Sequence, residues 1–513
     1  MSRKQPTFKP YYQNQLMAFP PTFDELIPKD HPVRIVDQVI NSINIEGLIK
    51  KYHQTGASSY HPMMLLKVLI YGYISNIYSS RKLSVACKEH IPFMWLSGMS
   101  KPDHNTINRF RGVRLKDSLR EIFSQIVLLL NEEGLLSIDE VFTDGTKVEA
   151  NAGKFTFVWK KSIQSNKLKM QQQLKDIWDY ASSIAKQEDD ELPPEPPTNK
   201  ELNKENLEAT IERINGVLGS TKKVDKKQRA KLLYIKKNFV NNLDKYTQQE
   251  DILGERNSYS KTDPDATFMR MKDDYMQNGQ LKPGYNIQIS TSNQYIVNYS
   301  IHPDATDTGT LKPHLEQHIE VFGQAPKTLV ADAGYGSQEN YELMETLGTK
   351  AYVKYGMFDK QQQEKEDRKK PFTSDKLYYN KELNLVICPM GQQMNYIGDI
   401  KRKTKKGYLQ SYSRYQAKDC SSCPLNGACH KASGNRVAEL NHQLMDYRIK
   451  AHQLLNSEQG IQKRKKRCWD VESVFGNIKQ NHRFRRFMLK GKEKVEIEWG
   501  LLAIAQNLRK KAA

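Results

Sequence analysis

The chain has 513 residues, enough for more than one structural unit, and 38% of them are hydrophobic and 27% charged. Its formal net charge of +20 favours a polyanionic partner, because lysine and arginine neutralise phosphates and release counterions. Its apolar runs are shorter than the roughly 18–20 residues that cross a bilayer, and its first residues show no apolar signal segment, so we expect a cytoplasmic protein that acts on nucleic acid rather than on a membrane.

Residues 1–125 are predicted to form a helical domain. The stretch 63–77 is dense in Leu, Ile and Tyr and contains no proline, which predicts a buried helix. Asp103 follows a proline and is a suitable N-cap for a helix that carries Arg109 and Arg111. A turn followed by a basic helix is typical of a helix-turn-helix DNA reader, and an ordinary helical hairpin with a solvated basic face explains it equally well.

Beyond residue 135 the hydrophobic pattern changes period. Residues 135–152 are predicted to be extended, and Asp144 lies within them, directly before a glycine. Residues 160–255 return to helical spacing and are interrupted by an acidic, proline-rich linker at 187–200. They predict a helical arm inserted into a domain that begins near residue 135, although a plain solvated helical bundle accounts for the same pattern.

Strands and helices alternate in the next segment. Residues 283–302 alternate apolar and polar side chains around Asn293 and predict a β-hairpin. A helix is expected over 308–322, with Asp307 as its cap. The sequence KTLVADAGYG then places Asp332 at the end of a short apolar strand, before a glycine-rich turn, and a further helix follows.

Four of the six cysteines lie close together in the segment 351–445. They have the spacing C-x31-C-x2-C-x5-C and are Cys388, Cys420, Cys423 and Cys429. Four thiolates can close a tetrahedral structural zinc site, with His430 as a substitute ligand. The alternative is four reduced thiols without a metal, as expected in a reducing compartment. We expect this segment to have a structural role or to contact DNA, not to take part in catalysis.

The last segment, 460–513, begins with a basic run and becomes helical. At 100° per residue, one stripe of the helix holds Glu472, Lys479 and Arg483 around a gap at Gly476. A separate apolar stripe should pack on the core; it consists of Val471, Val474, Phe475 and Ile478. The helix is therefore expected to present one carboxylate and two cations.

Three acids are placed to meet at one site: Asp144 and Asp332 at strand ends and Glu472 on the final helix. Mg²⁺ prefers a few carboxylates together with water and phosphate oxygens. Two such ions can activate a water or a 3′-OH and stabilise a leaving oxygen in phosphodiester chemistry. Taken singly, an Asp before a glycine is usually a turn residue and a Glu on a basic helix a solvated ion-pair partner. Their combination on this basic chain favours catalysis.

Several sequence blocks resemble the DDE transposases of bacterial insertion sequences. They are FTDGTKVEANAGK (142–154), PGYNIQ (283–288), VADAGYGSQEN (330–340) and VESVFGNIKQNHRFRRFMLKG (471–491). In addition, KPDHNTINRFR (101–111) resembles the PDHxTxxRFR element of the helical InsH-type domain of that group. The resemblance implies an RNase H-like core in which Asp144, Asp332 and Glu472 are the three catalytic acids that bind Mg²⁺ or Mn²⁺, two ions per active site. Glu472 and Lys479 match its E-x6-K spacing.

The resemblance and the predicted elements together give an α/β fold with an RNase H-like catalytic core. Its expected parts are a helical InsH-type DNA-binding domain (1–125), the core (135–159 and 256–350), the helical insertion arm (160–255), the cysteine-containing insertion (351–445) and the final catalytic helix with its basic segment (460–513).

One position departs from the pattern of the family. Related enzymes often have an arginine four residues before the glutamate, where this chain has Cys468, with Arg467 and Arg464 nearby. The many cations around the final helix are typical of a segment that follows a phosphate backbone, although a solvated charged face remains the alternative for the more distal ones. The expected DNA contacts are Lys479, Arg483, Arg485, Arg486, Arg467, Arg464, Arg109 and Arg111.

These expectations describe a transposase. It would bind the terminal inverted repeats of its element, cut the phosphodiester at the element's end with water, and join the freed 3′-OH to double-stranded target DNA. Two ends must be paired, so at least a homodimer is expected on DNA. Two alternatives stay open: an RNase H-like nuclease or junction resolvase that cleaves without joining, and a DNA-binding protein without catalysis. The presence of all three acids argues against the second.

Overall fold

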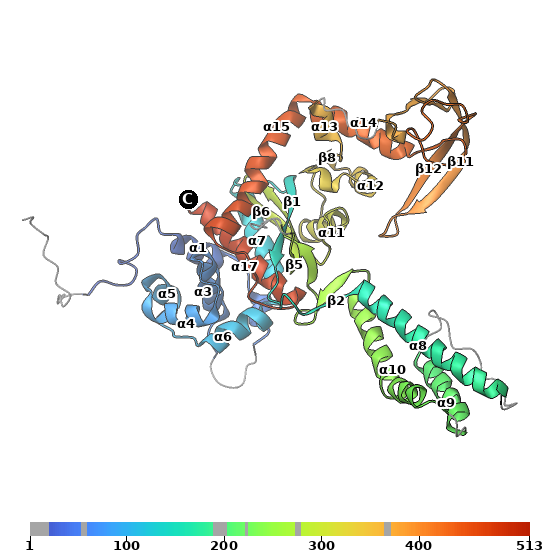
Figure 1. Cartoon of the computed structure of the whole chain (residues 1–513). Helices are drawn as coiled ribbons and strands as arrows, with labels where there is room; N and C mark the ends of the chain where they lie inside the picture. The colour runs from blue at the N-terminus through green and yellow to red at the C-terminus, as the bar shows by residue number, and fades with distance from the viewer. Residues whose placement is uncertain (1–19, 53–58, 188–202, 221–223, 272–278, 364–370) are drawn as a thin grey trace, which may run out of the picture. The chain divides into compact units, whose positions relative to one another are not determined.

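The computed structural model describes residues 20–52, 59–187, 203–220, 224–271, 279–363 and 371–513. It divides into two compact units, one formed by residues up to 126 together with 499–513 and the other by 127–498. Helices and strands are mixed, as expected for an α/β protein (Figure 1). The predicted linker at 187–200 lies, from residue 188 onward, outside the described residues. Among the described helices, none is both long enough and apolar enough to cross a membrane.

The first unit is built from helices. They are α1 (Pro32–Ser42), α2 (Glu46–Ile49), α3 (Pro62–Ile74), α4 (Ser80–Glu89), α5 (Ile91–Leu96), α6 (His104–Arg109), the π-helical turn η1 (Phe110–Arg114), and parts of α7 (Leu119–Glu132) and α17 (Lys492–Lys511). The predicted buried helix is α3, in which Leu66 and Leu69 are fully buried. Asp103 caps α6 as predicted, because its carboxylate accepts a hydrogen bond from the Thr106 amide at 2.8 Å.

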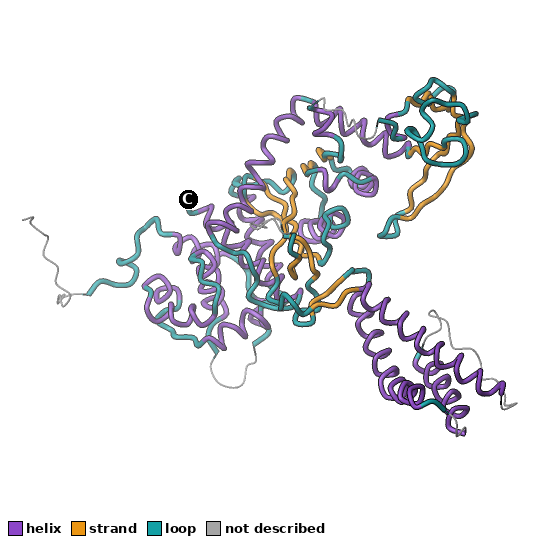
Figure 2. Tube along the Cα trace, in the orientation of Figure 1, coloured by secondary structure: helices purple, strands orange, loops and turns teal. Residues whose placement is uncertain are grey.

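A six-stranded sheet forms the centre of the second unit (Figure 2). Its strands are β1 (Glu140–Glu149), β4 (Thr267–Arg270), β5 (Leu281–Ser292), β6 (Tyr295–His302), β7 (Thr328–Ala331) and β8 (Lys350–Val353), in the order β4-β5-β1-β7-β8, with β6 also paired to β5. Strand β1 runs antiparallel to β5 and parallel to β7, and β7 runs parallel to β8. The predicted hairpin is confirmed as β5–β6, with Asn293 and Gln294 at positive φ in its turn.

Helices flank this sheet in chain order: α11 (Leu311–Phe322), the short 3₁₀ turn η2 (Ala333–Tyr335), α12 (Gln338–Thr346) and α13 (Phe358–Gln362). The prediction that Asp307 caps the first of these helices is wrong. Helix α11 begins after Thr310, whose hydroxyl bonds the main-chain oxygen of Asp307 at 2.7 Å. The Asp307 carboxylate instead accepts a hydrogen bond from the Asn286 side chain, which ties Asp307 to strand β5 of the sheet.

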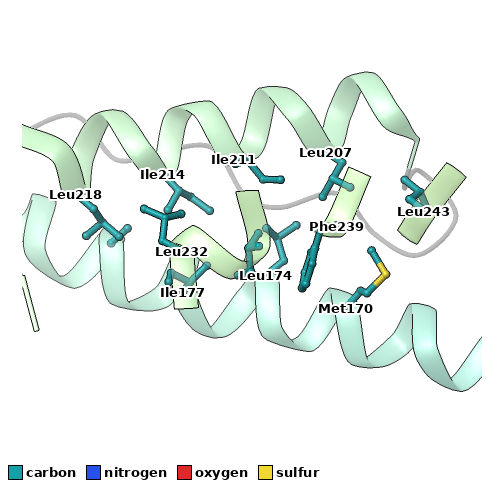
Figure 3. Close-up of a cluster of buried hydrophobic side chains, with 12 residues drawn as sticks. Met170, Leu174, Ile177, Leu207, Ile211, Ile214, Leu218, Leu232, Phe239 and Leu243 are labelled. Carbon is teal, nitrogen blue, oxygen red and sulfur yellow. The ribbon is translucent and has the colours of Figure 1, made fainter. Parts of the chain in front are cut away.

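The predicted arm consists of three helices, α8 (Lys160–Gln187), α9 (Lys204–Ser220) and α10 (Lys226–Leu253). A two-stranded sheet, β2 (Phe157–Trp159) with β3 (Ser258–Ser260), joins their base to the rest of the unit. Apolar residues at helical spacing from all three helices form one buried cluster (Figure 3); it includes Met170, Leu174, Ile177, Leu207, Ile211, Ile214, Leu218, Leu232, Phe239 and Leu243. The arm therefore has a core of its own.

The cysteine-containing segment forms a five-stranded antiparallel sheet. Its strands are β9 (Tyr378–Asn380), β10 (Leu385–Ile387), β11 (Gln393–Lys403), β12 (Leu409–Ala417) and β13 (Val437–Leu440), in the order β13-β12-β11-β10-β9, and the 3₁₀ turn η3 (Ser374–Lys376) precedes them. Val386, Met394 and Tyr415 are buried in its own small core. Strands β11 and β12 are its longest and extend together as a hairpin.

The final segment is not the regular helix that the spacing predicts. Helices α14 (His442–Asn456) and α15 (Glu458–Arg467) lead into the π-helical turn η4 (Cys468–Glu472), then α16 (Ser473–Gly476) and the π-helical turn η5 (Asn477–Asn481). The apolar stripe is confirmed, since Val471 and Ile478 are at most 1% exposed. The polar stripe is wrong: Lys479 is only 8% exposed, and Arg483 lies beyond the end of η5 at positive φ. Each π-helical turn holds one extra residue and so changes the phase of the faces.

Candidate active site

Asp144 is placed by the central strand of the large sheet. It lies in the middle of β1, where it pairs with Ile289 of β5, and it is 6% exposed. Its Oδ1 accepts a hydrogen bond from the next amide, that of Gly145, at 2.8 Å. A Cβ on Gly145 would stand 2.5 Å from the Gln288 side chain and 2.8 Å from the Asp307 carboxylate. The glycine of the TDG motif is therefore required by close packing beside the carboxylate.

Asp332 follows directly after β7, the strand that runs parallel to β1. Its Oδ1 accepts a hydrogen bond from the amide of Gly334 at 2.8 Å and so caps the turn η2. The register of β1 with β7 pairs Thr143 with Ala331, and Asp144 and Asp332 are the next residues along the two strands. The expectation that Asp144 lies at a strand end is wrong, because β1 continues to Glu149. The two carboxylates are neighbours because they follow the last paired residues of two parallel strands.

Glu472 is the last residue of the π-helical turn η4, and its side chain is 51% exposed. Asp470, in the same turn, is fully buried, and its Oδ1 accepts hydrogen bonds from the Thr291 hydroxyl at 2.7 Å and from the Gln294 amide at 3.0 Å. These bonds tie the turn to the β5–β6 hairpin. Asp470 thereby holds the element that carries Glu472 against the sheet that carries Asp144.

One guanidinium connects all three predicted acids. Arg467 Nη2 lies 3.3 Å from Asp144 Oδ2 and 3.8 Å from Asp332 Oδ2, and its Nη1 bonds Glu472 Oε1 at 3.1 Å. The side chains of Arg467 and Asp144 are only 11% and 9% exposed, so this charge pair is poorly screened by solvent. The structure therefore brings the three acids together around a single cation.

The π-helical turn explains why an arginine five residues before Glu472 reaches it. In a regular α-helix, residues four apart share a face, and Cys468 occupies that position. A π-helical turn closes with an i to i+5 bond, so residues five apart share a face instead. Arg467 thus takes the place that the sequence motif gave to Cys468, which is exposed. The sequence alone predicts Arg467 as a DNA contact and does not indicate its contact with the acids.

A fourth carboxylate, that of Asp307, lies beside the first two. Its Oδ1 accepts hydrogen bonds from Asn286 Nδ2 at 2.7 Å and from Gln288 Nε2 at 3.0 Å. A Cβ on Gly334 would stand 3.0 Å from Asp332 Oδ1 and 3.6 Å from Asp307 Oδ2. The sequence predicts Asp307 as a helix cap and not as part of the site. The sequence feature that could have indicated it is the pair of polar residues Asn286 and Gln288, two apart on β5, which bond its carboxylate.

A buried tyrosine, Tyr335, contacts Gln288 next to these carboxylates. It is fully buried, and its hydroxyl donates a hydrogen bond to Gln288 Oε1. Burial raises the pKa of Tyr335 well above its ordinary value, and the negative charges of Asp307, Asp144 and Asp332 act in the same direction. The tyrosine therefore stays protonated and fixes the Gln288 amide, whose nitrogen in turn faces Asp307.

The predicted DNA-contact residues fall into two groups. Arg483, Arg485, Arg486 and Arg109 are exposed. Lys479 and Arg467 are buried, and Arg464 is half-buried, with Nε bonded to the carbonyl of Leu455 at 3.1 Å. Arg111 is only 3% exposed and donates to the carbonyl of Tyr78 at 2.7 Å. Arg111 is thus a packing residue of the first unit, which corrects the expectation that it contacts DNA.

The four predicted zinc ligands line one cavity of about 260 Å³, together with His430. Cys429 Sγ accepts a hydrogen bond from Arg436 Nη1 at 2.6 Å, and Cys388 Sγ accepts one from the Gln392 amide at 3.2 Å. Both ring nitrogens of His430 are buried and have no hydrogen-bond partner among the described residues. Within the part of the chain that the structure describes, no group of three or more His, Cys, Asp or Glu side chains has a geometry that could hold a metal ion.

Comparison with known proteins bears on both ends of the chain. Residues 21–112 match the model of the Transposase domain (DUF772), and residues 387–512, which include Glu472 and Arg467, match the model of the Transposase DDE domain. No curated protein and no solved structure gives a significant match. The two matched segments together span less than half of the chain, and both support a DDE transposase of insertion sequences.

Proposed function

We propose that this transposase binds the ends of its insertion sequence, cleaves them and transfers the freed strands to target DNA, with Asp144, Asp332 and Glu472 as its catalytic acids. The observation that carries the proposal is the gathering of these three residues, from 144 to 472 in the chain, around the single guanidinium of Arg467. Acids assembled from the middle of one strand, the end of another and a helical turn are a costly arrangement, which proteins keep where charge is needed for chemistry.

The sheet supports an RNase H-like identity for the core. The central strand β1 runs antiparallel to β5 of the β5–β6 hairpin on one side. On its other side it runs parallel to β7, which in turn runs parallel to β8. The proposal includes the domains that the sequence predicts. They are a DNA-binding domain (1–125), the core (135–159 and 256–350), the arm (160–255), the cysteine-containing insertion (351–445) and the final segment (460–513).

The donor set suits Mg²⁺ or Mn²⁺, because it consists of carboxylate oxygens, and the side chains of Asp332 and Glu472 are partly exposed. Asp144, Asp332 and Glu472 would hold the metal, and two bound ions would supply activation of the attacking oxygen and stabilisation of the leaving one. Arg467 must then turn away from at least part of its present contacts.

DNA binding is assigned to the exposed cations near the final segment and on α6. Arg485 and Arg486 lie beside Glu149, at the end of the strand that carries Asp144, because the Glu149 amide bonds the carbonyl of Arg485 at 3.2 Å. Arg483, close by, is also exposed. These side chains would contact backbone phosphates near the cleavage point, and Arg109 would contact the inverted repeat. Pairing of two DNA ends requires at least a dimer on DNA, and the protein would act in the cytoplasm, on the nucleoid.

A structural zinc ion in the cysteine-lined cavity is a separate part of the proposal. The four thiols would bind it once Arg436 releases Cys429, with His430 as a substitute ligand for one of them. Zinc analysis of the purified protein should give about one equivalent for a single tetrahedral site. A content well below that would leave four reduced thiols as the correct description.

The function is tested with DNA that carries the ends of the element and Mg²⁺, comparing the wild type with Asp332→Asn. The carboxamide keeps an oxygen for the Gly334 amide but removes the charge, so the turn is preserved. We expect cleavage and joining to fall by at least about a hundredfold, the scale of losing one charge-stabilising group, with DNA binding unchanged. Asp251→Asn, at an exposed acid of α10, is the control.

The result distinguishes the alternatives. Full activity of Asp332→Asn would mean that another acid is catalytic. Cleavage by the wild type without any joining of pre-cut ends would identify a nuclease or resolvase. DNA binding without cleavage in Mg²⁺ or Mn²⁺ would identify a non-catalytic DNA-binding protein.

A further inference from the structure

The tip of the β11–β12 hairpin, here called the turn, consists of the last residues of β11 and the residues that follow it, and carries an unusual concentration of positive charge. The seven residues 400–406 have the sequence IKRKTKK, with five cations and no acid. Lys401, Lys403 and Lys405 are exposed, and none of the three forms an ion pair with a described residue. A compact group of unpaired lysines raises the local potential and attracts an anionic partner.

The other two cations of the turn are already engaged within the protein. Arg402 forms a bidentate pair with Glu439 of β13, at 2.7 and 2.9 Å. Lys406 Nζ lies 3.1 Å from Asp304 Oδ1, on the loop that leads to Asp307. Its side chain passes over Gly309 so closely that a Cβ there would stand 2.1 Å from it. Lys406 is thus an anchor of the turn.

Further bonds hold the hairpin against the catalytic half of the unit. The Tyr408 hydroxyl donates to Glu342 of α12, and Gln410 Nε2 donates to Gln338 Oε1 at 3.2 Å. Burial, followed by the bond to Glu342, raises the pKa of Tyr408, so it stays a protonated donor. The turn is therefore a fixed projection, and the ordering of its backbone does not have to occur on binding.

The alternation of the strands separates the anchoring face from the lysine face. Arg402 pairs with Gln410, whose side chain reaches α12, whereas Lys401 and Lys403 pair with Ser411 and Leu409. Successive side chains of a strand point to opposite faces, so Lys401 and Lys403 point away from the α12 contact. Among the described residues of β11 and β12, the acid on this face is Asp399, which accepts a hydrogen bond from the Ser413 hydroxyl.

The anchoring loop also connects the turn to the acids. Residues 303–309 contain Asp304, bound to Lys406, and Asp307, which lies beside Asp332 and Asp144. The Thr308 hydroxyl donates to the carbonyl of Gly334, two residues after Asp332, at 3.1 Å. A short run of contacts therefore links the lysine-bearing turn to the candidate active site.

We propose that Lys401, Lys403 and Lys405 bind the phosphate backbone of the same DNA duplex whose strand is cut at Asp144, Asp332 and Glu472. This inference rests on the proposed function and adds to it a second DNA-contacting element, located in the cysteine-containing insertion. The contact is independent of base sequence, because lysines on a hairpin turn meet phosphates as point charges. Its role is to hold the duplex while the acids act on one of its phosphates.

The test compares two triple variants that remove the same charge from the same insertion. One is Lys401→Ala with Lys403→Ala and Lys405→Ala. The control is Lys381→Ala with Lys418→Ala and Lys431→Ala, three exposed lysines outside the turn. Fluorescence anisotropy with the duplex that carries the element's end gives Kd across a range of salt. Loss of three phosphate contacts should lower the slope of log Kd against log salt by about 2.7.

When salt is raised from 50 to 200 mM, this difference in slope means that the wild type should lose about fortyfold more affinity than the turn variant. The control should keep the wild-type slope. In cleavage assays the turn variant should show a raised KM and an unchanged kcat, because the acids are intact. An unchanged slope in the turn variant, an equal change in the control, or a fall in kcat at unchanged affinity would each overturn the proposal.

Failure of the proposed function gives a different result. In that case the wild type and Asp332→Asn would not differ in cleavage, whatever the salt dependence of binding. If instead Asp332→Asn loses cleavage while the turn variant binds and cleaves as the wild type does, the catalytic assignment stands and only the role of the turn is wrong.

Discussion

The arm and the candidate active site are held together in opposite ways. The arm depends on local periodicity: Leu174 and Ile177, neighbours on one face of α8, are fully buried against the other two helices. The site depends on residues far apart in the chain, joined through charges and hydrogen bonds, such as Asp144 with Arg467 and Thr291 with Asp470. A change in the arm should therefore alter stability, and a change in the site should alter chemistry.

The largest effect that sharpens this comparison is expected at Arg467. In Arg467→Gln, three carboxylates lose their common cation, and we expect cleavage to fall by roughly a hundredfold or more, as for removal of a charge-stabilising group. Arg467→Lys keeps the charge without the fork of donors that reaches all three acids, so its activity should lie in between. Cleavage under single-turnover conditions measures both.

Affinity for DNA separates this role from a simple DNA contact. Because Arg467 is buried, Arg467→Gln should leave the affinity for DNA nearly unchanged. Arg485→Gln, at an exposed position, is the matched variant and should weaken binding with little effect on kcat. If Arg467→Gln weakened binding as Arg485→Gln does and spared kcat, Arg467 would be a DNA contact, as the sequence alone suggested.

A smaller effect is expected at Asp470, a positioning residue that does not touch the other acids. Asp470→Ala leaves the Thr291 hydroxyl and the Gln294 amide without their acceptor, and the turn that carries Glu472 should shift. A displacement of about 1 Å can cost up to a hundredfold in rate, so we expect a fall in kcat between about tenfold and a hundredfold.

Asp470→Asn supplies the control, because its amide oxygen can still accept both bonds. It should recover most of the rate, and KM for DNA should be unchanged in both variants. Equal loss in the two variants would show that the charge of Asp470, rather than its hydrogen bonds, matters at the site.

The same contrast explains what could be predicted from the sequence. The helices of the arm, the β5–β6 hairpin and the position of Asp332 after β7 follow from local patterns, and the structure confirms them. The π-helical turns could not be predicted, because the spacing of the apolar residues Val471, Val474 and Ile478 also fits a regular α-helix. Their effect was to exchange Cys468 for Arg467 beside the acids.

Contacts between residues far apart in the chain also could not be predicted from the sequence. Asp307 and Gln288 carry ordinary signals for a helix cap and a strand, and only the fold brings them beside Asp144. Arg111 shows the reverse error. Its position on a basic helix indicated DNA, but the packing of the first unit buries it against Tyr78. The periodic pattern around a polar residue predicts the helix or strand that contains it, whereas the residue that it contacts depends on the whole fold.

The smallest effect on chemistry is expected in the arm, where α10 offers two adjacent leucines in opposite surroundings. Leu232 belongs to the buried cluster drawn in Figure 3. It is 6% exposed, whereas Leu233 is 63% exposed. Leu232→Ala leaves a cavity and should destabilise the arm by about 2–5 kcal/mol, against less than about 0.5 kcal/mol for Leu233→Ala.

Hydrogen exchange resolves this loss where a global melt would not, because the arm can open without the rest of its unit. Protection of amides in α8, α9 and α10 should fall in Leu232→Ala alone, while amides in β1 and β7 keep theirs. The rate of DNA cleavage at a temperature where the arm stays folded should be the same in both variants. If Leu232→Ala instead lost cleavage with the arm still protected, the arm would act in the chemistry of the site, and the contrast between the two regions would not hold.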